Sequence, residues 1–288
     1  PKLAAVEQAE AAGKMPPVVA KNVAETLKNL PILVGVPGMA RSRHADGTWW
    51  LDMPTPFGDD GRIIQGSFTA HYWDYVTKDP AGPPPKTPDK ATMEAKFTDP
   101  QGHHYRVVLK TVLKPPFPGY ETQGGVMIDS YHHGLTGTGS PLMPKVRTYA
   151  AFWGMGDVYI DGALADENAV MHMMTTEVVR DRDYHLALNS EMPLPKDRWL
   201  VSGQPHHTHL IVLPVKAVHG QGPVFQPLKT AFMLPNGKPQ PFMHIMFEQD
   251  SLGPVTALQA SASDDLDEDS PASAFALGGS RRGMRSVP

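Results

Sequence analysis

Proline and glycine divide this chain into short segments. Among its 288 residues are 30 prolines and 26 glycines, and proline occurs at about twice its usual level of roughly 5%. Because proline lacks a backbone hydrogen-bond donor, it breaks helices and avoids the centre of a sheet. The chain therefore favours many short strands joined by turns, with little helix.

The first thirty residues contain the only segment with a clear helical pattern. Apolar residues recur there at spacings of four, four and three, after a proline pair and before Pro31. Such spacing places them on one side of a helix. We predict an amphipathic helix that packs on a larger body through Val19, Val23, Leu27 and Leu30.

Alternating apolar residues indicate strands from residue 62 onward. Segments 91–97 and 104–113 flank Asp99-Pro100-Gln101-Gly102, whose proline and glycine positions suit a type I turn, so we predict a hairpin. Other segments with strand patterns are 62–76, 146–153, 157–162, 169–179, 184–190, 208–218, 228–234 and 242–249. This succession predicts a mainly β protein, an antiparallel β-sandwich of immunoglobulin or cupredoxin type.

The sandwich is expected either as one large unit or as two small ones in series. We divide the chain into an N-terminal helical segment at 1–30, a first β region at 31–130 and a second at 131–258. The first region includes the Pro-rich loop 79–90. Residues 259–288 are of low complexity, with an acidic block before a basic end, and we expect a disordered tail.

Charge and cysteine content exclude several classes of protein. The formal charge of -4 and the lack of a basic block argue against nucleic-acid binding. No apolar run is long enough to span a membrane. With no cysteine, the chain has no disulfides, thiolate ligands or iron–sulfur clusters. The abundant Met, His, Pro and Gly lead us to expect a periplasmic or extracellular protein.

Histidine is the chemical resource that stands out. The thirteen histidines include a pair in "SYHHG", one in "VMHMM", three in "PHHTHL" and one in "FMHIM". Since residues two apart on a strand share a face, His172 is expected beside Met174, His207 beside His209, and His244 beside Met246. His132 and His133 are adjacent, so they would act together only from a loop.

These groups predict a transition-metal site if the strands are neighbours. Imidazole combined with thioether favours copper, Cu(I) especially, with iron or zinc as the alternatives. The candidate ligands are His132, His133, His172, Met174, His207, His209, His244 and Met246. The competing interpretation is packing, because methionine fills irregular gaps in a core well.

The order of these motifs resembles that of the ascorbate-dependent type II copper monooxygenases. In that family a His-His pair and a later His hold one copper, and a His-x-His pair with a Met holds the other. The resemblance would assign His132, His133 and His172 to the first site, and His207, His209 and Met246 to the second. It covers residues 131–247, with intervals roughly half of those in the family and without its disulfides.

Three functions agree with these features. The first is an exported copper-type metal-binding protein that holds or delivers the metal or uses it in redox chemistry. The second is a non-catalytic structural or interaction subunit that binds partners through its N-terminal helix or the tail 259–288. The third is an enzyme, a copper-dependent monooxygenase. The sequence leaves open whether the protein is an enzyme.

Overall fold

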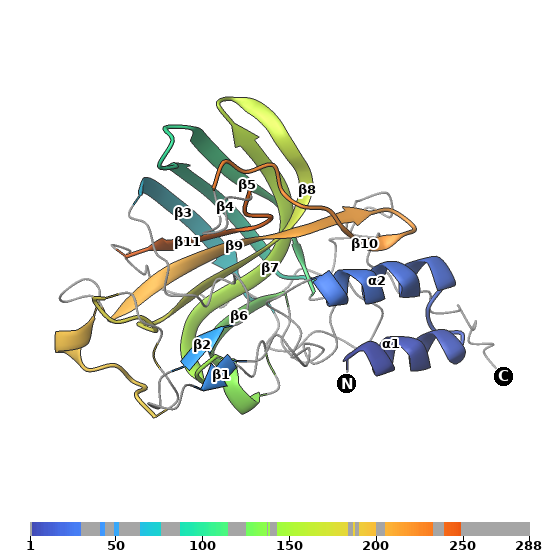
Figure 1. Ribbon diagram of the computed structural model, residues 1–288, viewed down its shortest axis with the longest axis horizontal. Coiled ribbons are helices and arrows are strands. Elements are labelled where there is room, and N and C mark those ends of the chain that lie inside the picture. Colours follow the sequence, from blue (N-terminus) through green and yellow to red (C-terminus); the bar gives the residue numbers. More distant parts are fainter. Residues whose placement is uncertain are drawn as a thin grey trace.

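In the part of the chain that the structure describes, the protein is mainly β: nine strands form a large antiparallel sheet that is not closed, and two short α-helices lie near the N-terminus (Figure 1). The computed structural model describes residues 2–29, 41–43, 49–51, 64–75, 87–114, 125–136, 138, 143–183, 187, 190–199, 205–232 and 239–248. The helices are α1 (Lys2–Ala11) and α2 (Pro17–Asn29). A separate pair of short strands consists of β1 (Arg41–Arg43) and β2 (Trp49–Leu51).

The large sheet runs in the order β10-β9-β8-β7-β5-β4-β3, and two strands branch from it. Strand β11 pairs with β9, and β6 pairs with β7. Its strands are β3 (Gln65–Trp73), β4 (Lys90–Thr98), β5 (His104–Leu113), β6 (Val126–His132), β7 (Val146–Ile160), β8 (Ala163–Glu177), β9 (His206–Val218), β10 (Gly222–Phe225) and β11 (Met243–Phe247).

A proline inside β9 marks the change from one partner strand to the other. Residues 208–212 pair with β11, whereas residues 215–218 pair with β10. Pro214 lies between the two stretches, where no ladder bond needs its missing donor. As a result, the first half of β9 lies between two strands, with β11 on one side and β8 on the other (Figure 1).

Each face of the sheet carries its own hydrophobic cluster. On one face, Leu213 and Val215 of β9 pack in a cluster with Val19 and Val23 of α2. On the other face lies a second cluster, which includes Phe152 of β7. Strand residues alternate between these faces. The face that meets α2 is called the helix-side face below, and it also carries the histidines.

Several predictions about local structure are confirmed. The apolar helix is α2, where Pro17 occupies the first helical position, which a proline tolerates because its missing N–H has no intrahelical partner there. The predicted hairpin joins β4 to β5, and the Gly102 N–H donates to the Asp99 carbonyl at 3.0 Å. The expected strand 146–153 and residues 157–160 of the expected strand 157–162 belong to one continuous strand, β7, and Asp161 and Gly162 form the turn that follows it.

The predicted strand at 228–234 is wrong over its described residues. Residues 228–232 are not in a strand. The Lys229 N–H donates to the Asp166 carboxylate at 2.9 Å, and the Ala231 N–H donates to the Tyr105 hydroxyl at 2.8 Å. Side chains therefore satisfy backbone donors that a neighbouring strand would otherwise bind. The alternating sequence pattern could not reveal this.

Some expectations fall outside the described residues. These are the tail 259–288, most of 31–60, the Pro-rich loop up to residue 86 and most of the candidate strand 184–190.

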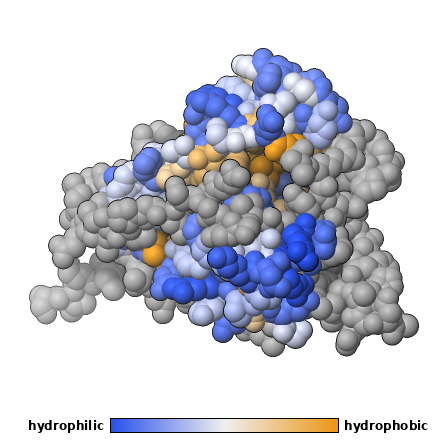
Figure 2. All heavy atoms as spheres, turned by 90° about the vertical axis from the view of Figure 1, so that its left-hand side faces the viewer, coloured by the Kyte–Doolittle hydropathy of each residue, from blue (hydrophilic) through white to orange (hydrophobic). Residues whose placement is uncertain are grey.

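In the described part of the chain, the only sheet besides the large one is the β1–β2 pair, so the second layer of a sandwich is not seen there. None of the described helices is long and apolar enough to cross a membrane. On the side shown in Figure 2, hydrophilic residues lie above and below a narrow hydrophobic band.

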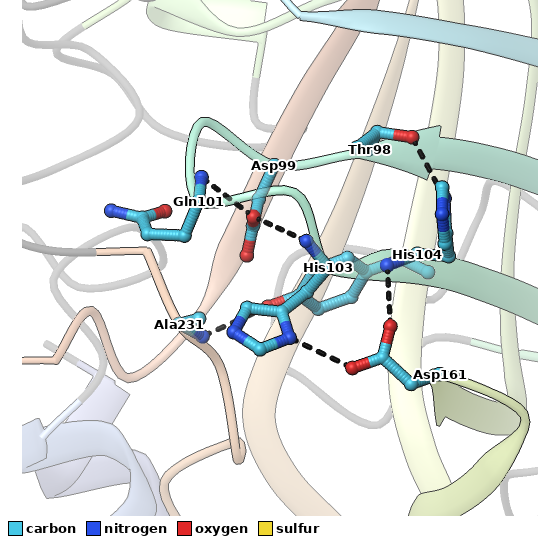
Figure 3. Close-up of polar contacts among 8 residues, drawn as sticks. Thr98, Asp99, Gln101, His103, His104, Asp161 and Ala231 are labelled. Atoms are coloured by element: carbon cyan, nitrogen blue, oxygen red, sulfur yellow. Dashed lines mark hydrogen bonds and ion pairs between the residues drawn. The ribbon is translucent and has the colours of Figure 1, made fainter.

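The turn at one end of the sheet is tied to its neighbours by polar contacts (Figure 3). Asp161, after β7, accepts the His104 N–H at 2.9 Å and contacts Nδ1 of His103 at 2.7 Å. Tyr105 follows His104 in β5, and its hydroxyl accepts the Ala231 N–H at 2.8 Å. Burial raises the pKa of Tyr105 to about 12, despite the opposing effect of that N–H.

The Tyr105 shift predicts loss of stability at alkaline pH. Because the folded pKa lies above the ordinary value of 10, the stabilising contribution is complete below pH 10 and is lost as the pH rises toward 12. Two pKa units correspond to about 3 kcal/mol in the free energy of unfolding. Urea unfolding at a series of pH values should show this fall in wild type and a smaller fall in Tyr105→Phe. Equal slopes in the two proteins would contradict the prediction.

Candidate metal centre

Three neighbouring strands bring the histidine and methionine motifs into rows on the helix-side face. Met174 of β8 lies opposite His209 of β9, and His209 lies opposite Met246 of β11. One row along, His172 and His244 both lie opposite Ile211. Directly opposed residues share a face, so these imidazoles and thioethers point to the same side, as the alternation predicted.

The next row in the other direction begins with His207. It lies opposite Thr176 of β8 and is two residues before His209, so it shares the same face. Its side chain is completely buried, and its ring stands perpendicular to that of His209 with centroids 4.3 Å apart. The "HTH" pair of the sequence therefore enters the protein rather than solvent.

A left-handed residue brings the adjacent pair His132 and His133 together. His132 ends β6, opposite Val146 on the helix-side face, and His133 begins the loop with φ of 60°. That backbone conformation breaks the strand alternation, which would send the two rings to opposite faces. The His133 N–H donates to the Thr138 carbonyl at 2.6 Å and closes the turn. Both imidazoles are buried, with centroids 6.3 Å apart.

His209 and His244 contact each other through their ring nitrogens. Nδ1 of His209 lies 2.8 Å from Nε2 of His244, the ring centroids are 5.1 Å apart and the ring planes differ by 22°. One ring must donate its proton to the other. Two nitrogens bound tetrahedrally to one metal ion at about 2.0 Å would be roughly 3.3 Å apart. A shift of about half an ångström would therefore let an ion replace the shared proton.

The proton position on His172 follows from its partner. Nδ1 of His172 lies 2.9 Å from the Phe152 carbonyl oxygen, which can only accept a hydrogen bond. The proton of the neutral ring is therefore on Nδ1, and Nε2 keeps its lone pair. Metal-binding histidines are commonly oriented by a backbone carbonyl in this way. Trp153 also stacks on the ring, with centroids 4.3 Å apart, and fixes its plane.

Burial keeps these rings unprotonated at neutral pH. It lowers the pKa of His132 to about 4 and that of His172 to about 3, the latter against the raising effect of the Phe152 carbonyl. Burial also lowers the pKa values of His133 and His209 far below the usual range, and the neighbouring rings add to the effect. Unprotonated imidazole is the form that binds metal ions.

One ring nitrogen of His132 has no partner among the described residues. Nε2 of His132 is buried without a hydrogen-bond partner, a costly state for a polar atom. Among the described residues, however, no three His, Asp or Glu side chains are close enough to hold a metal ion as they stand. The arrangement therefore resembles a site whose side chains still have to close around an ion.

The eight residues predicted from sequence fall into two groups that adjoin each other. Besides burial, the rings of His132 and His172 lower the pKa of His133, and the ring of His133 lowers the pKa of His209, so the two groups lie close to each other. The first group is His132, His133 and His172, and the second is His207, His209, His244, Met174 and Met246. Met174 is buried, whereas Met246 is half-buried.

Sequence reasoning did not assign Glu248 to this site. Its Oε1 lies 3.4 Å from Nδ1 of His207. A partial signal was present: Glu248 follows Met246 by two residues, but it lies just beyond the end of β11, so strand alternation alone does not place its side chain. The exposed histidines His71 and His219 lie outside both groups. His44 and His185 are outside the described residues.

Comparisons with known proteins assign no family. No protein-family model, curated protein or solved structure matches the chain. The protein is therefore described by its structure. Within the described residues it has a large open antiparallel sheet, and a buried cluster of histidines lies on the face of the sheet that packs against α1 and α2.

Proposed function

We propose that the protein binds copper, or a similar transition-metal ion, through the buried histidine and methionine side chains of the helix-side face. The first group offers three imidazoles from His132, His133 and His172. The second offers the imidazoles of His209 and His244, with the thioethers of Met174 and Met246 in the same row as His209. The role would be to hold or deliver the metal, or to use it in redox chemistry outside the cytoplasm.

The observation that carries the proposal is the convergence of six buried or half-buried imidazoles from four strands and one turn. A packing role does not explain it well, because burying an imidazole without satisfying its nitrogens costs free energy. The unpartnered Nε2 of His132 and the fixed proton on Nδ1 of His172 both leave lone pairs for an ion.

The donor set favours copper over the alternatives. Thioether and imidazole are neutral, soft or borderline ligands, which suit Cu(I) in particular. Zinc and iron sites more often include a carboxylate or thiolate, and no cysteine is present in the chain. A large antiparallel sheet gives the rigid frame that the expected sandwich would provide, because ligands on strands are held more firmly than ligands on loops.

Metal analysis of protein purified without a metal-affinity tag tests the proposal. We expect near-stoichiometric copper, either as isolated or after loading with Cu(I) under anaerobic conditions. Protein that remains metal-free after loading with copper, iron and zinc would refute it. A fixed partner that co-purifies only while residues 259–288 are present would then favour the structural-subunit alternative. Oxygen uptake with ascorbate that depends on an added substrate would identify an enzyme.

A further inference from the structure

His207 differs from the other histidines of the cluster because both of its nitrogens face protein groups. The Val179 N–H donates to Nε2 of His207 at 3.4 Å. This contact is possible only if Nε2 carries no proton. The proton of the ring is therefore on Nδ1, which lies 3.4 Å from Oε1 of Glu248.

The fold places the Glu248 carboxylate beside the His207 ring, but no hydrogen bond joins them. Oε1 of Glu248 and Nδ1 of His207 are both buried, and neither has a hydrogen-bond partner. An acceptor and a donor left unsatisfied so near each other form a hydrogen bond if they approach by about half an ångström. The side chain of Glu248 is 20% exposed, whereas that of His207 is fully buried, so Glu248 has the freedom to make this movement.

The pair is connected to the candidate ligands by direct packing. The His207 ring stands edge-on to the His209 ring at 4.3 Å, and His209 in turn contacts His244 through the 2.8 Å nitrogen pair. Glu248 is the first residue after β11, and its carboxylate lies beside His207, which is two residues before His209 in β9. A carboxylate that holds the His207 ring in place therefore also restricts the orientation of the His209 ring that packs against it.

We infer that Glu248 and His207 form a carboxylate–histidine pair that positions His209 for metal binding, and that His207 is a positioning residue rather than a ligand. This inference rests on the proposed function for its consequence, the affinity for the ion. The hydrogen bond itself does not require a metal to form.

Heteronuclear NMR of the metal-free protein tests the pair directly, because the nitrogen shifts of a histidine ring report which nitrogen carries the proton. In the wild-type protein we expect His207 to have its proton on Nδ1. In Glu248→Ala the Val179 N–H still favours the Nδ1 tautomer, so we expect the Nδ1 proton to stay but its resonance to move upfield and to exchange faster with solvent. In Glu248→Gln we expect a state closer to wild type, since the amide oxygen still accepts. An unchanged shift and exchange rate of the His207 Nδ1 proton in Glu248→Ala would overturn the inference.

Copper titration gives the second readout. We expect Glu248→Ala to raise the dissociation constant for copper roughly 10- to 100-fold without lowering the number of ions bound. This is the usual effect of losing a residue that orients a metal ligand. Glu177→Ala is the matched control. Glu177 ends β8 and accepts the Arg147 N–H at 2.7 Å on the exposed side, so its loss should leave copper binding unchanged.

The outcomes separate the two proposals. If the wild-type protein binds no metal, the proposed function fails, and the NMR result alone decides on the pair. If the wild-type protein binds copper and Glu248→Ala binds it equally well, the positioning role is wrong. Loss of one bound ion in His207→Gln or Glu248→Ala would also overturn it, because that result identifies a ligand.

Discussion

Replacing His209 by alanine is expected to weaken copper binding more than about 100-fold. Loss of a residue that only supports a ligand costs roughly 10- to 100-fold, so loss of a ligand should cost at least as much. His209 occupies the centre of the second group, with Met174 and Met246 opposite it on either side and His244 at 2.8 Å. Competition titration with a Cu(I) chelator measures the change.

Two further variants make this result specific. His172→Ala removes the residue of the first group with the best-defined tautomer, and it should also lower affinity or the number of ions bound. His219→Ala is the control, because His219 follows the same strand as His209 but is exposed. Equal copper binding by His209→Ala and His219→Ala would rule out the second group as a ligand set. Circular dichroism must show that each variant is folded.

Replacing Trp153 by alanine is expected to lower the free energy of unfolding by about 3–5 kcal/mol, the usual range for removing a buried tryptophan. Trp153 is 1% exposed and heads the largest fully buried side chains of the described residues. Its indole also stacks on His172 at 4.3 Å. The variant should therefore lose both stability and part of its affinity for copper, since the His172 ring is no longer held.

A neighbour of His172 on the opposite face separates these two effects. Met171 precedes His172 in β8, is fully buried and belongs to the other hydrophobic cluster. Met171→Ala should lower stability by about 2–5 kcal/mol and leave copper affinity unchanged. Urea unfolding of the metal-free proteins and copper titration provide the two measurements. If Met171→Ala weakens copper binding as much as Trp153→Ala does, the effect is one of general loosening.

The mainly β class could be predicted because its causes are local. Frequent proline and glycine limit the length of helices, and alternation gives strands such as β4 and β5 within a residue or so of their expected limits. The failure at residues 228–232 has a non-local cause. These residues have a strand pattern, but a carboxylate and a hydroxyl group far away in the sequence accept the N–H groups of Lys229 and Ala231. No window of sequence contains that information.

For the candidate site, the sequence by itself determined which side chains share a strand face. Spacings of two residues placed His172 with Met174, His207 with His209 and His244 with Met246, since side chains on a strand alternate strictly. Only the tertiary structure decided that β8, β9 and β11 are neighbours and that a left-handed His133 breaks the alternation beside His132. Strand order depends on contacts between distant segments, and backbone handedness depends on the turn that holds it, so neither can be read from spacing.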